Sequence, residues 1–151
     1  LLLVLENLQD PGNLGTILRA GEGAGVCGVV MSRDTADIYN PKVIRATMGS
    51  IYRMPFFYTE NLEEAIIRIK EAGVTVFAAH LKGEGNYDKC DYCRPSAFLI
   101  GNEGKGLTER TADLADSYVK IPMEGKVESL NAAVAAALLV YEAARQRRER
   151  D

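Results

Sequence analysis

The chain has 151 residues, of which 47% are hydrophobic and 26% are charged, a composition that excludes an intrinsically disordered protein. Its 18 basic and 21 acidic residues give a net charge of −3, which argues against binding nucleic acid chiefly through bulk electrostatics but leaves room for a local contact. No apolar run approaches the roughly 18 residues of a membrane span, so we expect no membrane partner.

Cysteine usage and the start of the chain bear on compartment and domain organisation. The 3 cysteines are an odd set and too few for a disulfide scaffold, which favours a cytoplasmic protein. The chain begins with Leu1, and no basic region or cleavage site of a signal peptide precedes the first apolar run. The length is that of one domain over 1–151, and we expect that an upstream segment has been removed.

The first half of the chain alternates apolar, β-rich runs with helical periodicity. The run Leu2–Leu5 predicts a buried strand, and apolar residues at i, i+3, i+4 and i+7 from Leu14 predict a helix that Asn13 can cap. A second helix is predicted from Pro41, a favoured first helical position, and a third over Leu62–Ile69. The strands expected between these helices are Cys27–Met31, Pro55–Tyr58 and Thr75–Ala79.

The second half continues the alternation after a polar loop over Leu81–Ser96, which is long enough to carry function. Strands are predicted at Ala97–Ile100 and Tyr118–Ile121, separated by a short helix over Thr108–Leu114 that Thr108 would cap. Because strands and helices alternate throughout, we predict an α/β fold with a mostly parallel sheet flanked by helices on both sides.

The C-terminal region predicts a last helix over Leu130–Tyr141, in which apolar residues keep the helical period for three turns. The basic tail 145–150 is interpreted as the solvated end of this helix, with a contact to an RNA backbone as the alternative. The alanines at the start of the helix would allow close helix packing in a dimer; they are Ala132, Ala133, Ala135 and Ala136.

Three segments match the outline of known sites but fail the tests of context. Gly23–Gly28 has the spacing G-x-G-x-x-G, yet it leads from a helix into a strand, so we interpret it as a tight turn. Gly101–Leu107 lacks the hydroxyl residue after Gly-Lys and the earlier glycine of a Walker A loop. Cys90 and Cys93 have metal-ligand spacing, but only one further cysteine and the single histidine remain as donors, so no metal site is predicted.

Three glycine-punctuated segments each follow a predicted strand and carry polar residues without an evident role in the core. We name them motif 1 (Glu6–Arg19), motif 2 (Leu99–Leu107) and motif 3 (Ile121–Ala133). Together they resemble the three signature motifs of the SpoU/TrmH family, within the SPOUT superfamily of RNA methyltransferases, in order and over essentially the whole chain. Motif 3 is the most specific, since Ile-Pro-Met-x-Gly-x-x-x-Ser-Leu-Asn is hard to find elsewhere.

The resemblance implies transfer of a methyl group from S-adenosylmethionine to a ribose 2′-hydroxyl of RNA, with S-adenosylhomocysteine as product and no metal. It also implies an α/β fold whose C-terminal segment threads a deep trefoil knot, and a homodimer with composite active sites. An rRNA substrate is favoured over tRNA, because many relatives that act on rRNA carry an N-terminal RNA-binding domain, and such a domain would precede this chain.

The resemblance assigns the catalytic role to Arg19, close to the RNA phosphate and the target hydroxyl. Because a guanidinium stays protonated, we expect Arg19 to clamp the phosphate and position the RNA, and the proton acceptor stays open. The residues that match the family's other polar positions are Asn13, Glu103, Ser129 and Asn131. The cofactor is expected, by resemblance, to lie against Ala79, His80, Leu99, Gly101, Ile121, Met123, Ser129 and Leu130.

Several of these residues also have a purely structural interpretation. Asn13 and Ser129 can be helix caps, Gly104 and Gly106 can be turn residues, and His80 is interpreted as a pocket wall rather than a general base. Two other functions stay open. One is a non-catalytic RNA-binding module that keeps the SPOUT fold, and the other is a small-molecule nucleotide-binding enzyme that uses the loop at 101–106.

Overall fold

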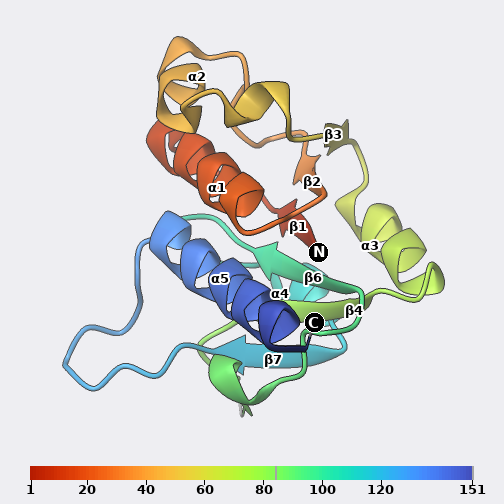
Figure 1. Ribbon diagram of the computed structural model, residues 1–151. Helices are drawn as coiled ribbons and strands as arrows, with labels where there is room; N and C mark the ends of the chain where they lie inside the picture. Colours follow the sequence, from red (N-terminus) through yellow and green to blue (C-terminus); the bar gives the residue numbers. More distant parts are fainter. Residues whose placement is uncertain (84, 151) are drawn as a thin grey trace.

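Figure 1 shows the computed structural model, which describes residues 1–83 and 85–150. Within these residues seven strands form one sheet in the order β3-β2-β1-β6-β4-β7-β5, and each neighbouring pair is parallel. The predicted parallel α/β fold is therefore confirmed. The strands are β1 (Leu2–Leu5), β2 (Gly28–Ser32), β3 (Phe56–Thr59), β4 (Thr75–Ala79), β5 (Gly85–Asn86), β6 (Ser96–Ile100) and β7 (Ser117–Lys120).

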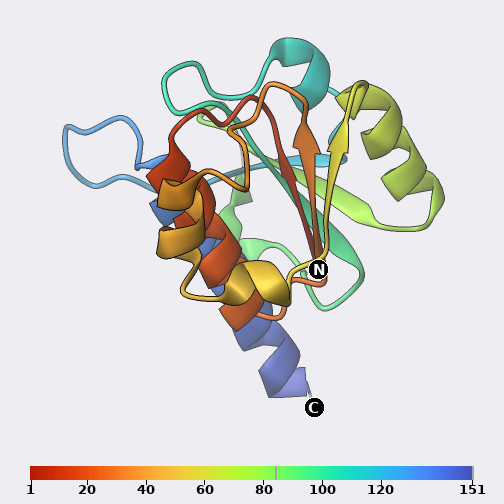
Figure 2. The same ribbon diagram turned by 90° about the horizontal axis from the view of Figure 1, so that it is seen from above.

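Helices cover both faces of the sheet. Figure 2 shows α1, α2 and α5 on one face and α3 and α4 on the other. No helix among the described residues is long and apolar enough to cross a bilayer. The helices are α1 (Pro11–Gly23), α2 (Pro41–Thr47), α3 (Leu62–Glu71), α4 (Glu109–Ala112) and α5 (Ala132–Arg150), with short 3-10 turns at Ser50–Tyr52 and Tyr87–Lys89.

The side chains of each central strand alternate between two hydrophobic cores. On β1, Leu3 and Leu5 pack in the core beneath α1 and α5, whereas Val4 packs in the core beneath α3 and α4. All three are at most 1% exposed. Because both faces of the strand are buried, it needs apolar residues at every position, which explains the continuous apolar run in the sequence.

Two helix starts differ from the sequence prediction. Helix α1 begins at Pro11 and its cap is Asp10, whose carboxylate accepts the amide N–H of Asn13 at 2.8 Å. The prediction that Asn13 caps this helix is therefore wrong. Helix α5 is capped by Asn131, whose Oδ1 accepts the N–H of Ala133 at 2.8 Å, and not by Ser129. Since Asn13 does not cap the helix, its side-chain amide can form hydrogen bonds with the neighbouring loops.

The turn from α1 into β2 follows the prediction. Helix α1 ends at Gly23 with Ala24 as its C-cap, Gly25 adopts a left-handed backbone with φ +81°, and β2 begins at Gly28. The glycine pattern Gly23–Gly28 is therefore a helix-to-strand turn, since it neither follows a strand nor opens a helix.

The C-terminal helix is longer than predicted, and its tail binds the protein surface. Gln146 exchanges hydrogen bonds of 2.9 Å with the backbone of Cys90 and Tyr92, and Arg147 donates to two carbonyls of the same loop. The interpretation of the tail as a solvated end is therefore wrong for these two residues. The loop backbone supplies polar groups that need partners, and the tail provides them. The predicted loop at 81–96 also contains β5 and a 3-10 turn.

Candidate functional site

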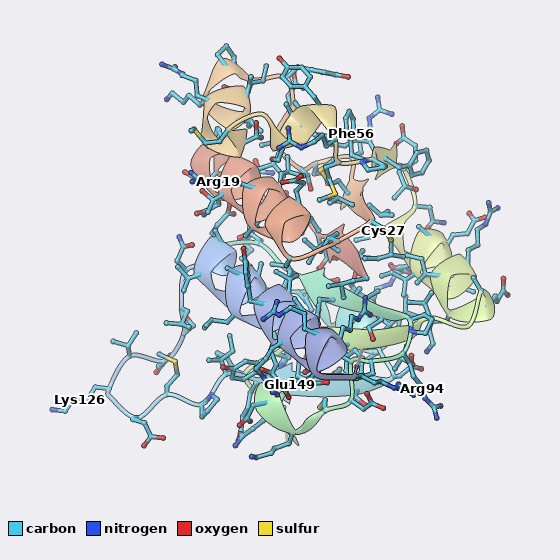
Figure 3. The ribbon with its side chains drawn as sticks, viewed as in Figure 1. Arg19, Cys27, Phe56, Arg94, Lys126 and Glu149 are labelled. Carbon is cyan, nitrogen blue, oxygen red and sulfur yellow. The ribbon has the colours of Figure 1, made fainter. Side chains whose placement is uncertain are left out.

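The three motifs meet at one edge of the sheet. Motif 1 follows β1, motif 2 follows β6 and motif 3 follows β7, and β1 pairs directly with β6. Because the strands are parallel, their carboxyl ends lie at the same edge, where ligands of open α/β sheets usually bind. Motif 3 forms a long exposed loop between β7 and α5, which projects from the body of the molecule with Lys126 near its tip (Figures 1 and 3).

A cavity of about 270 Å³ lies between the end of β4, motif 2, motif 3 and α5. Seven of the eight residues expected at the cofactor line it, namely Ala79, His80, Gly101, Ile121, Met123, Ser129 and Leu130. The exception is Leu99, which is 0% exposed in the core beneath α3. Strand alternation turns the next residue, Ile100, toward the cavity instead.

Motif 2 closes on itself in a narrow turn at the cavity wall. Asn102 and Gly106 form an isolated antiparallel bridge, with N–O distances of 3.1 and 2.8 Å. The side chain of Asn102 accepts the N–H groups of Gly104 and Lys105, both at 3.0 Å, and donates to the carbonyl of Asn7 at 2.8 Å. Asn102 is a positioning residue that the sequence interpretation missed. The signal for it was the asparagine that opens a Gly-rich turn.

Glu103 binds the backbone at the start of motif 1. Its carboxylate accepts the N–H groups of Gln9, at 3.0 and 3.1 Å, and of Asp10, at 2.7 Å. Burial alone would raise the pKa of Glu103, but these backbone bonds, together with a bond from Asn13, outweigh burial and lower the pKa from its ordinary 4.5. Glu103 is therefore an ionised anchor for the loop that leads into α1.

A chain of side-chain hydrogen bonds connects the three motifs. Asn13 Nδ2 donates to Glu103 at 3.5 Å, and Asn131 Nδ2 donates to Asn13 Oδ1 at 3.0 Å. One residue of each motif thus takes part, although the partners are 90 and 118 positions apart in the sequence. The fourth polar residue, Ser129, is exposed and lines the cavity beside this chain.

Arg19 lies apart from this group of polar residues. It is exposed on α1, six helical positions after Asn13, which corresponds to about 9 Å along the axis. The acidic residue one turn further on, Glu22, is paired with Arg53 at 2.8 Å. Figure 3 shows Arg19 on the part of α1 that adjoins α2. In the described part of this chain, no hydrogen bond connects Arg19 to the four other predicted site residues.

The packing of α2 against α1 fixes the position of the region of α1 that contains Gly15 and Arg19. An added Cβ at Gly15 would lie 2.4 Å from Ala46 Cβ and 2.6 Å from the carbonyl oxygen of Val43, so only glycine permits this contact. Arg19 is one helical turn beyond Gly15 on the same stripe of the helix. The position of the Arg19 backbone is therefore determined by a close helix–helix contact rather than by polar bonds.

Replacing Glu103 with glutamine should reduce the acid sensitivity of the protein. The folded state lowers the pKa of Glu103, so the unfolded state binds more protons when the pH falls through about 4.5. The contribution of the ionised Glu103 to the free energy of unfolding is therefore present at pH 7 and lost below that range. We expect E103Q to be about 1 kcal/mol less stable at pH 7, since charge-assisted bonds at an exposed carboxylate give the lower end of their usual contribution. The difference from wild type should shrink toward pH 3.5.

Urea unfolding at both pH values measures this effect. E124Q, at an exposed carboxylate of motif 3, is the matched control and should match wild type at pH 7 within about 0.5 kcal/mol. A stability difference between E103Q and wild type that is the same at both pH values would contradict the role of the ionised carboxylate.

The residues around the cavity suit a nucleoside-like cofactor with an apolar and a polar part. Apolar contacts come from Ile100, Leu107 and Leu139, while the turn of motif 2 presents backbone groups at the same wall. Among the described residues, no group of three His, Cys, Asp or Glu side chains could hold a metal ion. The thiols of Cys90 and Cys93 instead contact two different carbonyl oxygens.

Comparison with known proteins gives consistent matches. The sequence profile described as the SpoU rRNA Methylase family matches residues 1–141. The chain is 38% identical over 148 residues to a TrmH-family protein of Staphylococcus haemolyticus, which covers 98% of this chain and 59% of that protein. The chain thus spans about three fifths of the length of this relative.

Two solved structures with bound AdoMet are similar to this fold. The SpoU methyltransferase AviRb from Streptomyces viridochromogenes superposes with a TM-score of 0.91 at 32% identity, over 97% of this chain and 57% of that one. The rRNA methyltransferase from Sinorhizobium meliloti gives a TM-score of 0.88 at 38% identity, over 95% of this chain and 55% of that one.

Proposed function

This chain belongs to the SpoU rRNA methylase family, and from this membership we propose that it transfers the methyl group of S-adenosylmethionine to a ribose 2′-hydroxyl of RNA. The observation that carries the proposal is the hydrogen-bonded junction of Glu103, Asn13 and Asn131 beside a cavity of about 270 Å³ with apolar and polar lining residues. A similar solved structure, with a TM-score of 0.88 at 36% identity, is an RNA 2′-O ribose methyltransferase.

The site residues divide into a cofactor wall and an RNA-facing group. Gly101, Met123 and Leu130 would hold the cofactor, which supplies an electrophilic methyl group when bound. Arg19 carries a permanent positive charge on an exposed helix face, so its role is to bind an RNA phosphate and place the ribose. Glu103 is ionised and bound to backbone N–H groups, which makes it an anchor and a poor proton acceptor.

We propose rRNA rather than tRNA as the substrate. The net charge of −3 provides little general attraction for RNA. Additional segments of a longer protein, such as an upstream RNA-binding domain, would therefore provide most of the contacts to RNA. An enzyme of this class would act in the cytoplasm, as the cysteine usage predicts. The trefoil knot that the family resemblance implies stays a prediction.

Titration calorimetry with AdoMet and mapping of 2′-O-methyl sites in RNA test the proposal. We expect binding of one AdoMet per chain and new 2′-O-methyl nucleotides when the full-length protein is added to RNA. RNA binding without methyl incorporation would favour the non-catalytic module instead. Displacement of AdoMet by ATP in a thermal-shift assay would favour a nucleotide-binding enzyme, and no AdoMet binding at all would refute the proposal.

We also propose a homodimer that uses the outer face of α5. The predicted alanine face is wrong as a dimer surface, because Ala133 and Ala136 are buried within the protomer, and Ala132 and Ala135 line the cavity. The exposed apolar residues of α5 are Val134, Leu138 and Tyr141, which follow helical spacing on one stripe. Exposed apolar side chains gathered in this way are typical of an interface.

Replacing Leu138 with glutamate should convert the dimer to a monomer. A charge placed in an apolar interface is desolvated without a partner, which weakens association by a factor of about 100 or more. Sedimentation velocity at micromolar concentration measures the change. I67E, at an exposed apolar residue of α3 on the opposite face of the sheet, is the control and should stay dimeric. A wild-type protein that sediments as a monomer would contradict the proposal.

A further inference from the structure

The segment of residues 38–59 differs in charge from the rest of the chain. It contains three of the 18 basic residues and none of the 21 acidic residues, so all of the acidic excess lies outside it. Two of its basic residues, Lys42 and Arg45, are exposed on α2, and within the described part of the chain neither pairs with a carboxylate. Four arginines outside the segment do form such pairs, namely Arg33, Arg68, Arg110 and Arg145. A protein with a net charge of −3 thus carries a local basic surface around α2.

Two contacts place this basic segment beside Arg19. Gly15 of α1 packs against Ala46 of α2, and Glu22 of α1 pairs with Arg53, the residue after the 3-10 turn, at 2.8 Å. Arg19 lies four residues after Gly15 and three before Glu22, so the three share one stripe of the helix. Arg19 therefore stands between the two contacts, next to the residues that connect α2 to the 3-10 turn.

This connection presents two large side chains to solvent. Met48 and Gly49 both have a left-handed backbone, with φ 49° and 86°, and the chain turns sharply there. That conformation is uncommon and unfavourable for a residue other than glycine, and burial does not offset its cost, because Met48 is 69% exposed. Tyr52 is 84% exposed, more than any other large apolar side chain among the described residues. With the two basic residues of α2 they form a surface that we name the α2 surface: Lys42, Arg45, Met48 and Tyr52.

An exposed aromatic ring beside basic side chains without partners suits a single strand of RNA. The absence of acidic residues in the segment favours a polyanion, and the open ring favours a polyanion that has bases. A base of any type can stack on the face of Tyr52, since every base has a π-face. The planar guanidinium of Arg45 can bind a phosphate through two N–H groups. Contacts of this kind fix the position of the strand and do not depend on its sequence.

We propose that the α2 surface binds the single RNA strand that adjoins the methylated nucleotide. Arg45 binds a phosphate and Tyr52 stacks on a base of this strand, while Arg19 positions the target ribose. The inference rests on the proposed function and adds to it the path of the RNA across α2. Figure 1 shows α1 between α2 and α5, so the α2 surface is separate from the exposed stripe of α5.

Fluorescence anisotropy with a labelled oligouridine and the full-length protein measures both contacts. We expect Y52A to bind this RNA about tenfold more weakly than wild type, because one base loses its stacking partner. Y52F keeps the ring and should stay within about twofold of wild type. We expect R45Q to bind about fivefold more weakly and its affinity to depend less on salt. The slope of log affinity against log salt concentration should become shallower by about 0.7, the contribution of one phosphate on a single strand.

Heparin, a polyanion without bases, separates stacking from charge. R45Q should lose affinity for heparin as it does for RNA, whereas Y52A should bind heparin as tightly as wild type. R68A, at an exposed arginine of α3 on the opposite face of the sheet, is the control and should bind RNA within about twofold of wild type. AdoMet affinity should stay at the wild-type value in every variant, since none of these residues lines the cavity. An equal loss of RNA and heparin affinity in Y52A would overturn the stacking contact.

Crosslinking locates the RNA directly. After irradiation of wild type with oligouridine that contains 4-thiouridine, mass spectrometry should find the crosslink within the α2 surface. A crosslink confined to the basic tail 145–150, or no binding of oligouridine by wild type, would overturn the inference. Wild-type RNA affinity in both R45Q and Y52A would refute it while AdoMet binding and methyl transfer leave the proposed function standing. If wild type binds no AdoMet but both variants lose RNA affinity, the proposed function fails and the α2 surface stands as part of a non-catalytic RNA-binding module.

Discussion

Replacing Arg19 with alanine should lower kcat for methyl transfer about 100-fold or more, while the affinity for AdoMet stays within about twofold of wild type. Arg19 is exposed on α1 and does not line the cavity, so its loss leaves the cofactor wall intact. Removing a fixed charge that positions the reacting group usually costs two to three orders of magnitude in rate. Stability should change little, because the exposed Arg19 side chain makes no hydrogen bond to the described residues and such side chains contribute little to folding.

Single-turnover methylation of RNA and calorimetry with AdoMet measure the two quantities separately. R68A is the matched control, since Arg68 is also an exposed helical arginine but lies on α3, on the opposite face of the sheet. It should retain at least half of the wild-type rate. R19K tests geometry, because lysine keeps the charge but loses the planar, bidentate donor, and we expect an intermediate rate. A kcat of R19A within threefold of wild type would refute the assigned role.

Replacing Gly101 with alanine should abolish most of the AdoMet affinity and destabilise the fold by about 1–3 kcal/mol. A Cβ at position 101 would lie 2.1 Å from the carbonyl carbon of Gly106 and 2.2 Å from the nitrogen of Leu107. These are backbone atoms that cannot move aside as a flexible side chain can, so the turn of motif 2 has to open. Since that turn forms one wall of the cavity, we expect AdoMet to bind at least 30-fold more weakly.

The same turn provides the control for this substitution. An added Cβ at Gly104 would meet only Asn102 Oδ1, at 3.7 Å, which is an ordinary contact. G104A should therefore unfold within about 0.5 kcal/mol of wild type and, although Gly104 also lines the cavity, lose much less AdoMet affinity than G101A. Urea unfolding and calorimetry on both variants distinguish a steric effect at position 101 from a general need for glycine in the loop. Wild-type affinity in G101A would contradict the geometry described for motif 2.

The strand and helix periods of the sequence predicted the layers of this fold well, because they are local properties. Leu2–Leu5 and Thr75–Ala79 have the predicted bounds, and the other predicted strands differ by one residue at one or both ends. The family resemblance, rather than the periods, had indicated seven of the residues that line the cavity. The strand and helix periods do not indicate which polar residue caps a helix. Asp10 and Asn131 were selected over Asn13 and Ser129 by backbone direction at the helix starts.

By itself the sequence determined the α/β class, the family and the three motifs, because each depends on residue types at short, regular spacing. The tertiary structure alone decided how the motifs connect: Glu103 anchors residues 9 and 10, and Asn13 bonds to Asn131 across 118 positions. It also decided that Ile100 rather than Leu99 lines the cavity, and that Arg19 stands apart. Such pairings depend on where strands end in space, and no local pattern encodes that position.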